Sequence, residues 1–230
     1  SASSSRSGTS TPGTIRVLLV DDQALFREVV AVILQAAAGI EVVAQAGNGE
    51  HGVELADEHE PDVVVMDIRM PVLDGVEATR QLFAPERAAR RHRPLRVIVL
   101  TTFNLDDRAA LAIRHGASGF LLKDATPAML VDAVRTVHTG NAVLAPADLA
   151  SLLDASYRPP TPVPAAYEAL TDKEREVFLA AATGLSNQEI GAKVFASEST
   201  VKTHIGSVLR KLGLRDRVQI VVFAHEHSLV

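Results

Sequence analysis

Five polar residues stand where apolar runs of this sequence end, and three of them are carboxylates that could hold a metal ion. Asp21 and Asp22 follow IRVLLV, Asp67 follows DVVVM, Thr101 follows RVIVL, and Lys123 follows GFLL. If these runs are buried strands lying parallel in one sheet, the five side chains meet at the edge where open α/β sheets place their sites. Three clustered carboxylates repel one another unless a positive charge lies among them. We therefore expect Lys123 and a divalent cation at this edge.

The residue types also indicate what such a site can do. The carboxylate of Asp67 can attack phosphorus and form an acyl phosphate. Because the attacking group and the phosphoryl group are both anionic, the transfer depends on positioning and charge neutralisation. Asp21 and Asp22 offer the oxygen ligands that Mg²⁺ prefers, and Lys123 and Thr101 can contact phosphoryl oxygens. Taken singly, each residue has a simpler interpretation, such as a helix cap for the Asp21–Asp22 pair.

The elements that position these residues alternate between strand-like and helical patterns up to about residue 140. Strands are predicted at 15–20, 41–45, 62–66, 96–100 and 118–122. Helices are predicted to begin near Ala24, Gly49, Gly75, Asp106 and Thr126. Near-continuous apolar strands predict a parallel sheet covered on both faces, which is an α/β, doubly wound fold of five strands. The charged segment 84–94 is interpreted as a solvated loop.

Composition limits the function classes that remain open. The chain has 230 residues, a formal net charge of −5, 47% hydrophobic residues and no cysteine. Without cysteine there are no disulfides or thiolate metal sites, which fits a cytoplasmic protein. No apolar run reaches the roughly 18–20 residues that span a bilayer, so no membrane association is expected. Residues 1–14 have no apolar core and are interpreted as a disordered tail.

The pattern changes in the last third of the chain. Residues 155–166 contain four prolines and are predicted to form a spacer. We divide the chain into a tail (1–14), a first domain (15–140), a partly helical and then proline-rich linker (141–166) and a small all-α domain (167–230). Capping boxes are predicted at Thr171–Glu174 and Ser186–Glu189. Further helices are predicted at 198–212 and at about 215–226.

The first domain resembles the CheY-like receiver domain of two-component response regulators. The resemblance covers residues 15–140 and depends on the joint spacing of the five polar residues above, together with Met70–Pro71 and Asp74–Gly75. It implies strand order 2-1-3-4-5, Mg²⁺ as cofactor with the backbone carbonyl of Arg69 as a further ligand, and Phe120 as a switch aromatic that responds to Thr101. It also implies a sensor histidine kinase as the phosphoryl donor.

The second domain resembles the LuxR-type helix-turn-helix of the NarL/FixJ group over about residues 168–228. In the predicted helix 198–212, one apolar stripe consists of Val201, Ile205, Val208, Leu209 and Leu212. The opposite face is polar, and the N-terminal part of such a helix usually reads bases in the major groove. We predict that Lys202 and Thr203 contact base edges. The predicted phosphate contacts are Ser199, Thr200, Lys193 and Arg210.

Several residues depart from these patterns or allow another interpretation. Gly206 lies inside the predicted recognition helix, where glycine costs roughly 1 kcal/mol relative to alanine. His225 and His227 are two residues apart and do not share a helix face, so surface histidines are favoured over a metal site. The apolar residues Val218, Val221 and Val222 suit either a dimer contact, as the resemblance implies, or packing within the domain.

Together these features predict a DNA-binding response regulator that acts as a homodimer on promoter DNA. It is not expected to be an enzyme, apart from phosphorylating and slowly dephosphorylating its own Asp67. Slow hydrolysis is predicted because Arg69 and Phe103 crowd the path of a water. A haloacid-dehalogenase-like phosphatase is disfavoured, because Arg69 stands where that class needs an acidic residue. The other alternative is a constitutive DNA-binding protein whose first domain serves only as a scaffold.

Overall fold

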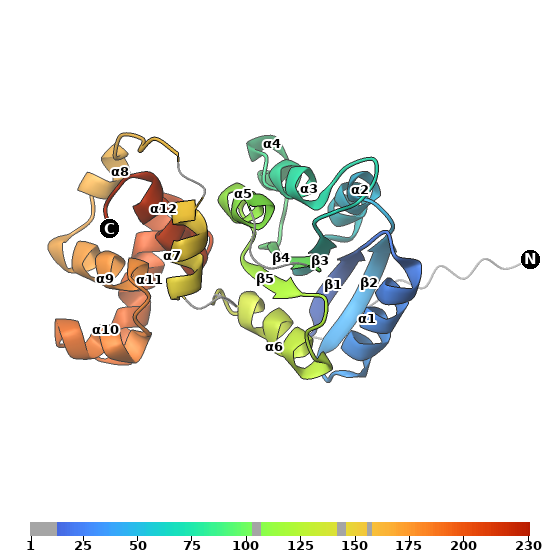
Figure 1. Ribbon diagram of the computed structural model, residues 1–230. Coiled ribbons are helices and arrows are strands. Elements are labelled where there is room, and N and C mark those ends of the chain that lie inside the picture. Colours follow the sequence, from blue (N-terminus) through green and yellow to red (C-terminus); the bar gives the residue numbers. More distant parts are fainter. Residues whose placement is uncertain (1–12, 103–106, 142–145, 156–157) are drawn as a thin grey trace, which may run out of the picture.

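The computed structural model describes residues 13–102, 107–141, 146–155 and 158–230 of the chain. Most of the predicted tail, and Phe103, lie outside these described residues. Within them the chain forms an α/β unit and a helical unit, which lie side by side with helices α7 (Pro146–Ala155) and α12 (Arg217–Glu226) between them (Figure 1). The boundaries proposed for the two domains stay a prediction.

A five-stranded sheet forms the centre of the α/β unit, as predicted. Its strands are β1 (Ile15–Val20), β2 (Ile40–Ala46), β3 (Val63–Asp67), β4 (Arg96–Thr101) and β5 (Gly119–Leu122). All neighbouring pairs are parallel, and the order β2-β1-β3-β4-β5 confirms the expected topology. Every residue of β3 is buried, because a central parallel strand is covered on both faces. The carboxyl ends of β1, β3, β4 and β5 therefore meet at one edge.

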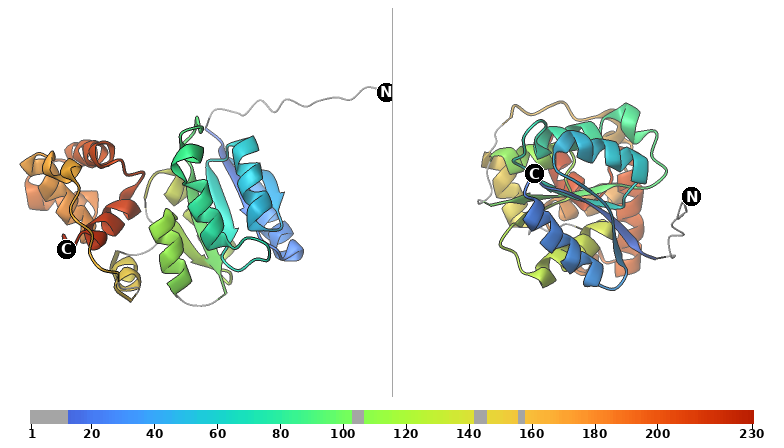
Figure 2. Two further views of the ribbon diagram at one scale, coloured as in Figure 1. Left: turned by 90° about the horizontal axis from the view of Figure 1, so that it is seen from above. Right: turned by 90° about the vertical axis from the view of Figure 1, so that its right-hand side faces the viewer.

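Helices cover both faces of the sheet and define two apolar cores. Helices α1 (Ala24–Ala36) and α6 (Pro127–His138) cover one face. Helices α2 (Gly49–His59), α3 (Gly75–Leu82) and α5 (Asp107–His115) cover the other (Figure 2). Thr126 caps α6 by accepting a hydrogen bond from the backbone N–H of Met129, as the sequence predicted. This layering fixes the strands and so fixes the groups at their ends.

The charged segment 84–94 is not simply a solvated loop. It contains a short helix, α4 (Pro85–Ala88), which begins with proline at its first position. Arg91 is only partly exposed, and its guanidinium carbon lies 5.9 Å from the centroid of the Phe83 ring. Burial lowers the pKa of Arg91 to about 10. Because charged residues alternate with alanine in this segment, the sequence pattern did not predict that it packs along the end of α3.

The helical unit follows the predicted helix boundaries closely. A short helix α8 (Ala165–Glu168) precedes α9 (Asp172–Ala182), α10 (Asn187–Val194), α11 (Glu198–Leu212) and α12. Both predicted capping boxes are present at the starts of α9 and α10. Phe178, Ile190, Val201 and Val208 are fully buried in a third core at the centre of these helices. No helix within the described parts of the chain is long and apolar enough to span a bilayer.

Candidate functional site

The predicted acidic residues come together at the carboxyl edge of the sheet. Asp21 and Asp67 are 3% and 6% exposed, whereas Asp22 faces solvent. Their carboxylate ligand atoms lie within 4.8 Å of one another, and no other such group of metal-ligating side chains occurs in the described part of the chain. The apolar strands β1 and β3 end at the same level because they pair in register, Val20 against Met66. Strand pairing therefore forces the carboxylates together.

Lys123 supplies the positive charge at the centre of this cluster. Its Nζ atom lies 2.7 Å from Oδ2 of Asp21 and 3.1 Å from Oδ2 of Asp67. The Lys123 side chain is only 9% exposed, and its Nζ atom also lies 4.7 Å from the centroid of the Phe26 ring. The backbone N–H of Lys123 donates to the carbonyl oxygen of Thr101, which holds the end of β5 against the end of β4. Lys123 thus bridges two carboxylates that come from different strands.

The charges at this edge shift the pKa values of the groups that carry them. Burial raises the pKa of Asp67, and the neighbouring carboxylate of Asp21 raises it further, against the opposing effect of Lys123. For Lys123, burial lowers the pKa, but the carboxylates of Asp21 and Asp67 outweigh burial and raise it. Lys123 is therefore a permanent cation at neutral pH. The cluster remains short of positive charge, because one lysine faces three carboxylates.

The loop after β3 forms one wall of the site. A Cβ on Gly75, the first residue of α3, would lie 2.1 Å from the carbonyl oxygen of Asp67, so only glycine fits there. The backbone N–H of Arg69 donates to Oδ1 of Asp67 at 3.4 Å. Arg108, from the first turn of α5, pairs with Asp74, the residue that caps α3. Arg108 was not predicted as a site residue, because no local pattern distinguishes it from other helical arginines.

A cleft of about 480 Å³ opens beside the acidic cluster. It is lined by Asp22, Arg69, Met70, Pro71, Asp74 and Arg108. The two arginines that line the cleft favour binding of an anionic ligand, while the carboxylates beside it favour binding of a cation. The charges around the cleft therefore suit both parts of a metal-bound phosphoryl group, the anionic phosphoryl oxygens and the metal cation.

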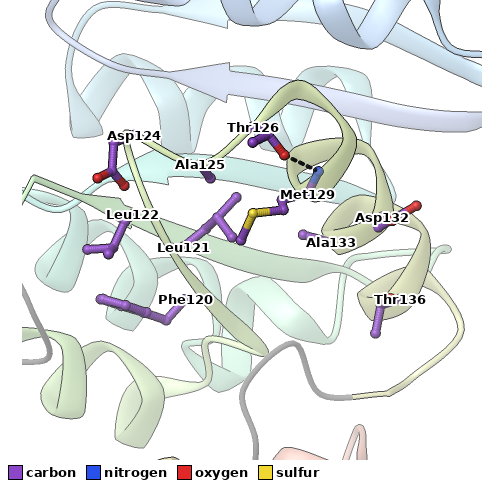
Figure 3. Close-up of a pocket in the computed structure, with 10 residues that line it drawn as sticks. All are labelled: Phe120, Leu121, Leu122, Asp124, Ala125, Thr126, Met129, Asp132, Ala133 and Thr136. Atoms are coloured by element: carbon purple, nitrogen blue, oxygen red, sulfur yellow. Dashed lines mark hydrogen bonds between the residues drawn. The ribbon is translucent and has the colours of Figure 1, made fainter.

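The two residues proposed to respond to the site are buried at the ends of β4 and β5. Thr101 is 5% exposed and Phe120 is 7% exposed. Figure 3 shows Phe120 and Leu122 on one side of β5, and Leu121 on the other side, toward Met129 of α6. Phe120 belongs to the same apolar core as the α5 residues Ala109 and Ile113. In this structure the ring of Phe120 therefore lies inside the protein, against the core that α5 covers.

The donor set of the acidic cluster fits Mg²⁺. Hard divalent cations prefer carboxylate and carbonyl oxygens, and Mg²⁺ keeps several waters. Asp21, Asp22 and Asp67 provide only oxygen ligands, and the exposed Asp22 leaves one side open to solvent. Metal charge would also compensate the carboxylates that Lys123 alone does not neutralise. A histidine pair elsewhere does not form a similar group: His225 lies 3.6 Å from Asp154, and His227 contacts Thr161.

The polar face of α11 is exposed, while its apolar stripe is packed inward. Val201 and Val208 are fully buried, and the exposed residues Lys202, Thr203 and Gly206 lie on the opposite side. Lys202 extends into solvent with its Nζ atom 3.7 Å from Glu198, and its side chain is 66% exposed. Helix α11 therefore exposes a polar face while its own core stays packed.

The other predicted DNA contacts differ in how freely they can reach phosphates. Ser199 and Lys193 are exposed. The hydroxyl of Thr200 lies 2.8 Å from that of Ser197, the residue that caps α11. The hydroxyl of Thr203 donates to the carbonyl oxygen of Ser199, and Arg210 donates to the hydroxyl of Ser207. Each of these three groups therefore has part of its hydrogen-bonding capacity used by a neighbour within or next to α11.

Helix α11 lies opposite the α/β unit across a polar cavity of about 850 Å³. From α11 this cavity is lined by Glu198, Lys202 and Gly206 among others, and from the α/β unit by Arg96, Thr139 and Gly140. The sequence analysis did not anticipate this arrangement. The residues named from the two sides lie between 58 (Gly140 to Glu198) and 110 (Arg96 to Gly206) positions apart in the chain, and no local sequence pattern predicts such contacts.

Both halves of the chain match known families. Residues 17–135 match the response regulator receiver domain, and residues 168–224 match the bacterial regulatory proteins of the luxR family. The transcriptional regulatory protein LiaR of Bacillus subtilis (strain 168) is 39% identical over 216 residues, which cover 94% of this chain and 99% of LiaR. The response regulator protein VraR of Staphylococcus aureus (strain Mu3 / ATCC 700698) is 34% identical, with 94% and 99% covered.

A solved structure gives the same result for the fold. The crystal structure of a two-component response regulator of the LuxR family from Aurantimonas sp. SI85-9A1 is 32% identical, with a TM-score of 0.53. The similarity covers 62% of this chain and 96% of that one. With a receiver sheet, a helix-turn-helix unit and relatives that match over their whole length, the chain belongs to the LuxR family of DNA-binding two-component response regulators.

Proposed function

We propose that this protein is a transcription factor whose DNA-binding domain is controlled by phosphorylation of Asp67. A sensor histidine kinase supplies the phosphoryl group, and double-stranded promoter DNA is the target. The observation that carries the proposal is the contact of one lysine with two buried carboxylates, beside a third that is exposed. Such a cluster is unfavourable without a further cation, and a bound cation can in turn attract an anionic phosphoryl group.

The transfer step follows from the positions of these groups. A carboxylate oxygen of Asp67 forms a bond to phosphorus while the bond from phosphorus to the donor nitrogen breaks, and that nitrogen keeps the electron pair. Lys123 lies beside Asp67 and pairs with one phosphoryl oxygen, and the Thr101 hydroxyl donates to another. Asp21, Asp22, Asp67 and the backbone carbonyl of Arg69 would hold Mg²⁺, which would supply charge neutralisation for the transferred group.

The product is expected to be long-lived. Arg69 lines the cleft through which a hydrolytic water would approach, and it cannot act as a general base. A haloacid-dehalogenase-like phosphatase would need an acidic group at this position. We therefore expect slow loss of the phosphoryl group, and a half-life of seconds in a decay assay on the purified protein would contradict this.

Two copies are expected to bind DNA together. A helix-turn-helix dimer engages two half-sites about one helical turn apart, and the recognition helix of each copy enters the major groove. In this proposal Lys202 and Thr203 of α11 reach base edges, and Ser199, Thr200, Lys193 and Arg210 reach phosphates. The exposed polar face of α11 supports these assignments.

Labelling with a small phosphodonor tests the site. The full-length protein is incubated with radiolabelled acetyl phosphate in the presence or absence of Mg²⁺. We expect Mg²⁺-dependent incorporation into the wild-type protein and into Asp132→Asn, an exposed control on α6. Asp67→Asn should incorporate nothing. Incorporation that persists in Asp67→Asn would remove Asp67 as the acceptor, and no incorporation into the wild-type protein would favour the constitutive alternative.

A further inference from the structure

Arg108 reaches the cleft beside the acidic cluster from a different element than its neighbours there. It is the second residue of α5, and it lines the cleft of about 480 Å³ together with Asp22, Arg69 and Asp74 among others. Of the lining residues in the described part of the chain, Arg108 alone belongs to α5, whereas the others follow β1 or β3. The transfer step proposed for Asp67 leaves Arg108 without a role.

Asp74 holds Arg108 at this cleft through one carboxylate oxygen. The Oδ1 atom of Asp74 accepts a hydrogen bond from the backbone N–H of Glu77 at 2.9 Å and so caps α3. The Oδ2 atom of Asp74 accepts from a terminal nitrogen of Arg108. A guanidinium carries five N–H donors, arranged so that two of them can meet two oxygens side by side. The contact with Asp74 therefore uses only part of what the Arg108 side chain can donate.

The pair of Arg108 and Asp74 is also weak enough to exchange. The two side chains are 43% and 33% exposed. Ion pairs at such exposure contribute little to stability, because water screens them and because ordering two side chains costs entropy. Lys123, by contrast, is only 9% exposed and contacts both Asp21 and Asp67. Arg108 can therefore change its partner, whereas Lys123 is fixed in the cluster.

The backbone keeps the pair close to Asp67. Gly75, the residue after Asp74, donates its N–H to the carbonyl oxygen of Ile68 at 2.8 Å. A Cβ at Gly75 would lie 2.1 Å from the carbonyl oxygen of Asp67. The loop after β3 thus folds back on Asp67 and fixes the place of Asp74 relative to it. Arg108 is therefore held beside the position that a phosphoryl group on Asp67 would occupy.

A phosphoryl group on Asp67 would be a better partner for Arg108 than Asp74 is. Such a group brings three acceptor oxygens and about two negative charges, and a pair of its oxygens matches the planar fork of a guanidinium. Lys123 and Thr101, the contacts already proposed for it, lie at the ends of β5 and β4. The cleft opens instead beside the loop after β3. One side of the phosphoryl group is thus accessible to Arg108.

We propose that Arg108 is a further phosphoryl-binding residue, which Asp74 holds at the cleft until Asp67 is phosphorylated. On phosphorylation the guanidinium leaves Asp74 and contacts phosphoryl oxygens, while Asp74 continues to cap α3. This inference rests on the proposed function and adds one residue to the same site. One ion pair replaces another in this step, and no covalent bond or proton changes place.

Two substitutions act on this exchange in opposite directions. Arg108→Gln removes the charge that would contact the phosphoryl group. Asp74→Asn removes the charge that competes for Arg108 but keeps the helix cap, since asparagine and aspartate cap helices about equally well. Arg80→Gln is the matched control, because Arg80 also pairs with a carboxylate, that of Glu77, but does not line the cleft.

The probe is beryllofluoride with Mg²⁺, a non-covalent mimic of a phosphoryl group on a carboxylate, titrated against the full-length protein. The rise in melting temperature with probe concentration gives the apparent affinity. We expect Arg108→Gln to weaken binding about tenfold, the effect of losing one hydrogen bond to a charged group. Asp74→Asn should tighten binding about threefold, because a weak competing ion pair is gone. Arg80→Gln should bind as wild type does.

The double variant and Mg²⁺ alone provide two further readouts. In the Arg108→Gln background, Asp74→Asn should have no further effect on beryllofluoride binding, because the group for which Asp74 competes is absent. Titrated without beryllofluoride, Mg²⁺ should bind Arg108→Gln at least as tightly as wild type, since a positive charge near its ligands has been removed. A purely structural role of Arg108 would instead lower both affinities together.

Three results would overturn the proposal: unchanged beryllofluoride affinity in folded Arg108→Gln, an effect of Asp74→Asn that persists in the double variant, or a parallel loss of Mg²⁺ affinity. Arg108→Lys, which keeps the charge but loses the planar fork, replaces Arg108→Gln if that variant does not fold, and it should weaken binding about threefold. Failure of the proposed function looks different. In that case the wild type itself binds no beryllofluoride and takes up no label from acetyl phosphate, which would remove the site and this inference together.

Discussion

The two functional surfaces of this protein are built in opposite ways. The acidic cluster takes its groups from the ends of three strands, and its central members are buried and touch one another. The polar face of α11 comes from one continuous helix, and its exposed side chains contact only near neighbours in the sequence among the contacts described above. Substitutions in the cluster should therefore change the charge balance of every member. Substitutions on α11 should act locally and nearly additively.

Removal of Lys123 should break the cluster most severely. Lys123→Ala leaves Asp21 and Asp67 without the lysine that contacts both, and phosphoryl transfer should fall roughly 100-fold. The same variant should gain more thermal stability from added Mg²⁺ than wild type does. Labelling rates and melting curves, compared with those of the exposed control Lys173→Ala, measure both effects. Wild-type labelling in Lys123→Ala would show that the cluster is not interdependent.

The DNA-binding domain contains a buried carboxylate, Glu174, whose pKa is shifted in the direction opposite to that of Asp67. Glu174 is 6% exposed and accepts hydrogen bonds from Lys211, the backbone N–H of Thr171 and the hydroxyl of Ser207. These bonds, with that from Lys211 the largest contribution, lower the pKa of Glu174 from 4.5 to about 2. A lowered pKa means that the ionised group stabilises the fold above pH 4.5 and loses this effect as the pH falls toward 2.

Glu174→Gln tests this assignment. At pH 7 the variant should unfold at a lower temperature than wild type. The difference should shrink below pH 4.5 and nearly vanish near pH 2, because wild-type Glu174 is then protonated as well. Calorimetry of the full chain across this range measures the change, with Glu168→Gln as an exposed control in the same domain. A difference that is independent of pH would contradict the assignment.

Substitutions on α11 should have smaller and separable effects. Lys202→Ala should cost about 1–3 kcal/mol of binding to a selected duplex and relax the preference at one base pair. Lys193→Ala, which removes a predicted phosphate contact, should weaken binding equally for all sequences and reduce the salt dependence. Titrations at several salt concentrations distinguish the two. Equal effects of both variants on every sequence would remove Lys202 from the base contacts.

Gly206 should give the smallest effect. No atom lies within 4 Å of a Cβ built at this position, and the residue is inside α11. Gly206→Ala should therefore stabilise the DNA-binding domain by about 0.5–1 kcal/mol, since alanine restricts the unfolded chain and favours the helix. Urea unfolding of the full chain measures the gain. A loss of stability would mean that position 206 is packed against another group.

The features that could be predicted from the sequence are those that local residue patterns determine, namely the strands and the helix caps. The strands were recognisable because apolar runs such as DVVVM end in charged residues, and the capping boxes at Thr171 and Ser186 follow from side chains three positions apart. The strand order came from a family resemblance, because crossover connections are not encoded in any single segment. The short helices α4 and α8 were missed, since four residues carry little periodic signal.

The contacts between the two domains could not be predicted from the sequence, for a different reason. Ser118 and Asp216 are separated by 98 positions, and each has an ordinary local interpretation, Ser118 as a residue before a strand and Asp216 as a helix cap. The valines of α12 remained ambiguous because an apolar face does not identify its partner. Such contacts are decided by tertiary packing, and only the folded chain reveals them.

The central claim is that a phosphoryl group on Asp67 controls DNA binding through α11. The most direct test measures the affinity of the full-length protein for its selected duplex before and after treatment with a phosphodonor and Mg²⁺. In wild type the affinity should rise by about 5- to 150-fold, the usual range for allosteric coupling, and in Asp67→Asn it should not change. An unchanged affinity in wild type that carries the phosphoryl group, or an equal rise in Asp67→Asn, would contradict the account.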